Sequence, residues 1–159
     1  MRVFYDLLRL SNKKGTRLGV IMTRHELREQ IFLLLFRIEF NSVEEMPEQL
    51  TYFFENDESK ASQEDELYIS AKYGNIVNRL EEIDKLINEK AKGWDTKRMG
   101  KVDLTIIRLA VYEILFDEDI PESVAINEAV ELAKKFGQDE SSGFVNGILA
   151  KFASKKDDK

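Results

Sequence analysis

Cysteine is missing from all 159 residues of this chain, and its absence excludes three classes of site. Without thiols the protein can have no disulfide scaffold, no cysteine-based metal centre and no thiol nucleophile. Histidine is almost missing as well, because His25 is the single example. Neither a nucleophile nor an orienting partner for it is evident in the sequence. We therefore predict a protein that is not an enzyme, with no catalytic residue.

Ligands for other bound groups are also scarce. The acidic run at residues 117–119 lacks the glycine and the terminal glutamate of a calcium-binding loop, and we interpret it as a turn. The eight glycines are scattered and form no loop that could cradle a phosphate. The sequence therefore predicts no metal site.

Proline and long apolar runs are rare. The two prolines, Pro47 and Pro121, leave long stretches free to form helices. The longest apolar run, residues 31–36, is far shorter than the roughly 20 residues that a membrane-spanning helix needs. Asp6 and Arg9 interrupt the first ten residues where a secretory signal would be apolar. We therefore expect a cytoplasmic protein that does not act at a membrane.

Charge is distributed unevenly along the chain. The whole chain has a net charge of −6, yet residues 1–28 contain seven Lys and Arg against Asp6 and Glu26, a net charge of +5. A basic N-terminal end on an acidic body indicates a localised surface for anions, with nucleic acid as one such partner. Ordinary fluctuation in a highly charged sequence would produce the same pattern.

Helical periodicity organises the first half of the chain. Thr23 and Glu26 form a capping-box pattern, after which apolar residues recur at helical spacing as far as Ile38. Ser42 and Glu45 repeat the pattern before a second helix. We expect a polar loop at residues 56–65 and then one long helix over residues 66–91, which Gly93 ends.

The second half is predicted to be helical too. Residues 103–116 are apolar almost all round, which is typical of a central, covered helix. Pro121 opens the next helix, and Gly137 is expected to close it as a C′ residue. The last helix is expected to begin near Ser141, with Gly147 allowing another helix to approach closely.

No segment shows sustained alternation with period two, so we predict an all-α fold, and helix bundles are what such elements build. Met22 opens a fresh start before the first capping box. We therefore interpret residues 1–21 as a disordered N-terminal extension produced by a mis-assigned start, residues 22–153 as the folded domain and residues 154–159 as a charged tail.

Three blocks of sequence are far more specific than these patterns. RMGKVDLTIIRLAVYEILF at residues 98–116 resembles the central helix of the NusB family. The same family pattern continues through IPESVAINEAVELAKKFG at residues 120–137 and SSGFVNGIL at residues 141–149. The N-terminal stretch from Arg24 to Phe36 resembles the basic opening helix of that family, and the resemblance spans about residues 22–153.

The resemblance implies a NusB-like bundle of about seven helices in two packed subdomains. It also implies a transcription antitermination factor that binds single-stranded boxA RNA of ribosomal RNA leaders and needs no cofactor. NusB-like proteins do so together with the small-subunit ribosomal protein that acts as NusE, within an RNA polymerase antitermination complex. The alternative is a protein-interaction module of the same fold with little or no RNA binding.

Both ends of the domain contribute predicted RNA-binding residues. Basic side chains hold phosphates and aromatic rings stack on bases, so these residue types suit single-stranded RNA. Core packing is an open alternative for each of the phenylalanines. The predicted set is Arg24, His25, Arg28, Phe36, Phe136, Ser141 and Phe144.

The ribosomal-protein partner is expected on the acidic body of the chain. Asp103 occupies an acidic position that relatives use for it. Asp103 is equally explained as a helix N-terminal charge that is favoured by the helix dipole. The chain also departs from the family, since relatives carry consecutive arginines where Arg24, His25 and Glu26 stand, and a His and a Lys within the stretch at residues 140–143. The loss of that His and Lys removes phosphate donors, which predicts modest RNA affinity without the protein partner.

Overall fold

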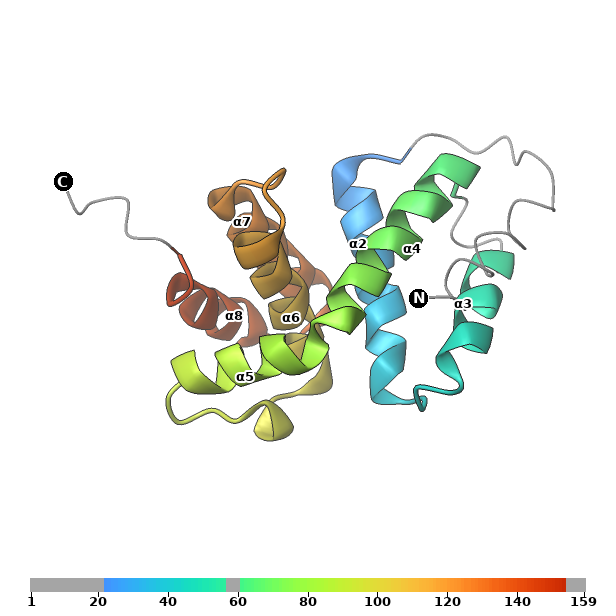
Figure 1. The fold of residues 1–159 in the computed structure, drawn as a ribbon. Coiled ribbons are helices and arrows are strands. Elements are labelled where there is room, and N and C mark those ends of the chain that lie inside the picture. Colours follow the sequence, from blue (N-terminus) through green and yellow to red (C-terminus); the bar gives the residue numbers. More distant parts are fainter. Residues whose placement is uncertain (1–21, 57–60, 154–159) are drawn as a thin grey trace. The chain divides into compact units, whose positions relative to one another are not determined.

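The computed structural model describes residues 22–56 and 61–153 (Figure 1). Over these ranges the chain is all-helical, with seven α-helices, two short 3₁₀ turns and no strand, which confirms the predicted fold class. The extension predicted at residues 1–21 and the tail predicted at residues 154–159 lie outside the described residues. The chain divides into two compact units between Val77 and Asn78. None of the described helices is both long and apolar enough to cross a membrane.

The first unit contains three α-helices and one 3₁₀ turn. Its largest fully buried side chains are those of Ile31, Phe32, Leu34, Ile69 and Ile76. The elements in chain order are α2 (Arg24–Phe36), η2 (Arg37–Glu39), α3 (Met46–Glu55) and α4 (Gln63–Asn78).

Both predicted pairs of reciprocal hydrogen bonds form, but only the first caps a helix. Thr23 Oγ1 accepts a hydrogen bond from the Glu26 backbone N–H at 3.2 Å, and Glu26 Oε2 accepts one from the Thr23 N–H at 2.7 Å. The first box satisfies N–H groups that the start of α2 would otherwise leave unpaired. Ser42 and Glu45 exchange the same two bonds at 3.3 and 2.8 Å, but they do so in the turn ahead of α3, whose N-cap is Glu45 and has no side-chain cap hydrogen bond.

The boundaries of α4 differ from the prediction at both ends. The helix begins at Gln63, inside the predicted loop, because Ser62 caps it: Ser62 Oγ accepts a hydrogen bond from the Asp65 N–H at 3.1 Å. It ends at Asn78, so one long helix over residues 66–91 is wrong. Arg79 adopts φ −112° and ψ 10°, outside the helical range, and a new helix follows.

The second unit contains four α-helices and one 3₁₀ turn. The central helix predicted at residues 103–116 is confirmed, since Ile106, Ile107 and Val111 are fully buried. It contacts the three other α-helices of this unit. The elements are α5 (Leu80–Lys90), η3 (Thr96–Arg98), α6 (Lys101–Phe116), α7 (Glu122–Phe136) and α8 (Ser141–Ala150).

Of the two predicted roles for glycine, one is confirmed and one is corrected. Gly137 ends α7 as predicted, with an extended backbone at φ −91°. Glycine is needed there for space, because an added Cβ would lie 2.5 Å from the Ser141 side chain and 2.7 Å from the Ala133 carbonyl oxygen. Gly147 has no neighbour within 4 Å of an added Cβ, so it does not serve a close helix approach.

Candidate nucleic-acid interface

The basic start of α2 has one accessible guanidinium. Arg24 is exposed, and its side chain has no ion pair or hydrogen bond to the other residues that the structure describes. Arg28, one turn later, is 5% exposed and has an interaction partner within the protein. His25 is exposed, and its Nε2 lies 4.0 Å from Glu29 Oε2. Of the three predicted phosphate contacts, Arg24 is therefore best placed to meet a polyanion.

A row of three aromatic rings lies at the other end of α2. Phe36 stacks on Phe32 with ring centroids 6.0 Å apart, and it meets Phe40 edge to face at 5.0 Å. Phe32 is 1% exposed, whereas Phe40 is 60% exposed. Phe36 is half-buried between them. It lies about 18 Å from Arg24 along the helix at 1.5 Å per residue, so one RNA strand reaches both only by following α2.

The turn between α7 and α8 holds Phe136 and Ser141. Phe136 is half-buried, and Lys135 Nζ lies 5.4 Å from its ring centroid. Ser141 is 5% exposed, and its hydroxyl accepts a hydrogen bond from the Gln138 N–H at 2.9 Å. The Ser141 hydroxyl therefore holds the turn together, and its contact with RNA stays a prediction. Of the two predicted residues at this turn, Phe136 has the more accessible side chain.

Phe144, one turn into α8, packs against the only tryptophan of the chain. The ring centroids of Phe144 and Trp94 are 5.1 Å apart and the planes meet at 70°, an edge-to-face pair. Phe144 is half-buried, whereas Trp94 is 51% exposed. The pair joins α8 to the connection between α5 and α6.

That connection is shaped by Gly93 and by two side-chain caps. Gly93 has φ +90°, a conformation that glycine adopts without strain. The Thr96 N–H donates to Asn88 Oδ1 at 2.8 Å, and the Lys97 N–H donates to Asp95 Oδ1 at 2.9 Å. Asn88 precedes Trp94 in the chain and Thr96 follows it, so the first of these hydrogen bonds ties together the two sides of Trp94.

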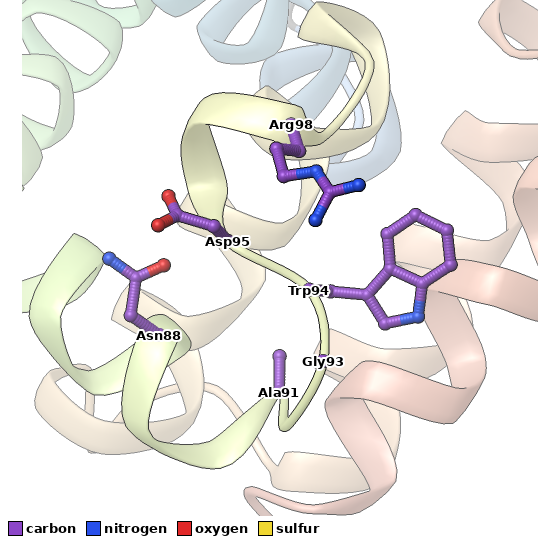
Figure 2. Close-up of a pocket in the computed structure, with 6 residues that line it drawn as sticks. All are labelled: Asn88, Ala91, Gly93, Trp94, Asp95 and Arg98. Carbon is purple, nitrogen blue, oxygen red and sulfur yellow. The ribbon is translucent and has the colours of Figure 1, made fainter.

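A shallow pocket of about 290 Å³ lies at this connection (Figure 2). Figure 2 shows the Trp94 indole projecting toward the α8 ribbon, with the Arg98 guanidinium beside it. Arg98 is exposed, and no hydrogen bond or ion pair joins its side chain to other described residues. The lining residues are Asn88, Ala91, Gly93, Trp94, Asp95 and Arg98.

The connection is also basic. Residues 90–101 have a net charge of +4 in a chain whose overall charge is −6. Asp95 is the single acidic residue among them. The five cations are Lys90, Lys92, Lys97, Arg98 and Lys101, all of them exposed.

Asp103 lies in the first turn of α6, and its side chain is half-buried. This position is compatible with both explanations of the residue, a partner contact and a favourable charge at a helix N-terminus. Its contact with a protein partner stays a prediction. In the described ranges, no group of three or more His, Asp or Glu side chains is arranged to hold a metal ion.

The predicted site residues thus fall into two groups, one in each unit. Arg24, His25 and Phe36 offer side chains on α2, and Phe136 and Phe144 do so around the α7–α8 turn. Analysis of the sequence missed Trp94 and Arg98. A signal for them was available, because the only tryptophan stands within the most basic stretch of the second half.

Comparisons with known proteins agree with this fold. Residues 25–154 match the NusB family. The protein named Transcription antitermination protein NusB from Agathobacter rectalis is 56% identical over 133 residues, which are 83% of this chain and 100% of that protein. Its counterpart in Lachnoclostridium phytofermentans is 50% identical over 82% of this chain and 98% of that protein.

Solved structures are similar as well. T. maritima NusB has 34% identity and a TM-score of 0.73, and the match covers 86% of this chain and 94% of that chain. A chain in a crystal structure of antitermination factors NusB and NusE in complex with dsRNA has 28% identity and a TM-score of 0.68, over 81% of this chain and 94% of that one. Fold, sequence blocks and relatives agree, and this chain belongs to the NusB family.

Proposed function

We propose that this protein is a non-enzymatic transcription antitermination factor of the cytoplasm. It binds single-stranded boxA-type RNA of ribosomal RNA leaders together with the small-subunit ribosomal protein that acts as NusE. The assembly joins an RNA polymerase antitermination complex and helps the polymerase to read through terminators.

The observation that carries the RNA-binding part is the accessible guanidinium of Arg24. It lies in the first turn of a capped helix on a chain whose net charge is −6, so the cation is localised. Exposed arginine suits phosphate because its planar fork can donate two hydrogen bonds to one group. Half-buried Phe36, Phe136 and Phe144 add rings on which unpaired bases can stack.

A similar solved structure supports the proposed protein partner. The similar chain in the complex with NusE and dsRNA supports both a protein and an RNA partner for this family member. Asp103, half-buried at the start of α6, is the residue that we propose for the ribosomal protein. Its side chain would pair with a basic group of the partner.

A protein-interaction module with little RNA binding is the second candidate. This candidate is favoured because two of the predicted RNA-binding residues are buried: Arg28 and Ser141 are each 5% exposed. Any positive charge on His25 also faces the carboxylate of Glu29 at 4.0 Å.

Fluorescence anisotropy with labelled boxA-type RNA separates the two candidates. We expect saturable binding that strengthens when the ribosomal protein is added, and weaker binding to a scrambled RNA of equal length. Equal, weak binding to both RNAs with and without the ribosomal protein would favour the interaction module. The titration is repeated at several salt concentrations, because phosphate contacts weaken as salt rises.

A further inference from the structure

The basic connection between α5 and α6 carries an exposed indole, Trp94, that the predicted site does not include. Trp94 is 51% exposed although its ring is the largest in the chain. An aromatic ring of this size is usually buried for the most part. Phe144 contacts it edge to face at 5.1 Å, which orients the indole without covering both of its faces.

Three features of this surface point to a nucleic-acid base as the occupant. The indole offers a flat apolar face, and the Arg98 guanidinium beside it offers a planar cation, the two kinds of group on which unpaired bases stack (Figure 2). The surrounding charge of +4 over residues 90–101 complements a phosphate backbone. The hydrogen bonds to Asn88 and Asp95 restrain the connection, which lowers the entropic cost of binding.

We infer that Trp94, Phe144 and Arg98 form a stacking platform for one unpaired base of a bound RNA strand. This inference rests on the proposed function and extends it, since it assigns RNA contacts to the α5–α6 connection. The indole stacks on the base, Phe144 positions the indole, and Arg98 contacts the base plane or the adjoining phosphate. The exposed lysines of the connection guide the strand toward it.

The chain supplies its own reporter for this platform. Trp94 is the only tryptophan, so selective excitation of tryptophan observes this position alone. We expect single-stranded boxA-type RNA to quench the emission of the full-length protein with the same midpoint as the anisotropy titration. A strand of equal length without bases should leave the emission nearly unchanged, because it supplies charge but no ring.

Substitutions give a second readout. Trp94→Ala should weaken RNA binding about tenfold, within the range for loss of one stacked base, whereas Trp94→Phe keeps a ring and should lose about threefold or less. Arg98→Ala should weaken binding severalfold, and Lys85→Ala serves as the control because Lys85 is an exposed cation of α5 outside the connection. Circular dichroism checks that each variant is folded.

The failure of this inference is distinct from failure of the proposed function. If RNA binds by anisotropy but the Trp94 emission does not respond and Trp94→Ala and Arg98→Ala bind with unchanged affinity, the platform is refuted and the proposed function stands. If the emission responds to the ribosomal protein and not to RNA, the surface belongs to the protein partner and the inference is also refuted. Absence of any RNA binding, with or without that partner, overturns both.

Discussion

Arg108 of α6 and Asp84 of α5 form a two-pronged ion pair. The Arg108 Nε donates to Asp84 Oδ1 and its Nη2 donates to Asp84 Oδ2, both at 2.7 Å. Their side chains are 13% and 26% exposed, so solvent screens the pair only partly. The pair ties together the two helices that the basic connection joins, and it thereby supports the geometry around Trp94.

Breaking this pair should destabilise the second unit. Arg108→Lys keeps the charge but loses the planar fork, and we expect the free energy of unfolding to fall by about 1–3 kcal/mol. The control is Lys134→Ala, which removes an exposed ion pair to Glu131 at 3.4 Å and should change it by about 0.5 kcal/mol or less. Urea denaturation followed by circular dichroism measures both variants. An equal loss of unfolding free energy in the two variants would show that the two-pronged contact of the Arg108 guanidinium is not important for stability.

Two glycine-to-alanine substitutions should act in opposite directions. Gly137→Ala places a Cβ 2.5 Å from the Ser141 side chain and should cost about 1–3 kcal/mol, as overpacking does. Gly147→Ala adds a methyl group in open space inside α8 and should stabilise by up to about 1 kcal/mol through helix propensity. Thermal denaturation of the pair measures the difference. A stabilising Gly137→Ala would show that the α7–α8 turn adapts freely.

Alkaline pH should weaken the first unit through Tyr73. Burial raises the pKa of Tyr73 to about 12 from its ordinary value of 10.0. The folded state therefore holds this proton more tightly than the unfolded chain does. The stability that protonated Tyr73 contributes is fully present below pH 10 and is lost as the pH rises toward 12. At about 1.36 kcal/mol per pKa unit, the loss reaches roughly 2–3 kcal/mol.

Tyr73→Phe removes this titrating group while keeping the ring. We expect its free energy of unfolding to fall less than that of the unaltered protein between pH 9 and pH 11.5. Urea titrations of both proteins across that range measure this difference. The lysines and the other tyrosines titrate in both proteins, so the difference between the two reports on Tyr73 alone. Parallel curves would exclude a role for Tyr73 in the alkaline loss.

Arg24→Ala should reduce RNA affinity with little effect on folding, because the side chain is exposed. A cation that contacts one phosphate contributes about one unit to the slope of log affinity against log salt, so the magnitude of that slope should decrease by roughly one. Lys85→Ala is the matched control, since it removes an exposed cation from α5. If both variants change the slope equally, the effect reflects total charge rather than a site on α2.

Most element positions were predictable because their signals are local. The capping residues Thr23 and Ser42 bond to groups three positions away, so four consecutive residues suffice to recognise them. The break at Arg79 was missed because no breaker residue marks it: apolar spacing continues across it, and only the backbone angles interrupt the helix. The early start of α4 was missed because Ser62 lies within a polar stretch that suits a loop equally well.

The candidate site was predictable by residue type but not by accessibility. Arg24 and Arg28 lie one helical turn apart and have the same side chain, yet Arg24 is exposed and Arg28 is only 5% exposed. Ser141 is a plausible hydrogen-bonding contact from sequence, but its hydroxyl accepts from the Gln138 N–H at 2.9 Å. Trp94 was left out of the predicted site, because the sequence does not show that its indole is 51% exposed.

The amino-acid sequence by itself determined the helical class, the caps and the family blocks, because these depend on neighbours within a few residues along the chain. Only the tertiary structure decided which side chains remain accessible, because exposure is set by segments that are distant in sequence. Phe144 of α8 contacts Trp94 fifty residues earlier in the chain, and that contact leaves the indole 51% exposed beside Arg98.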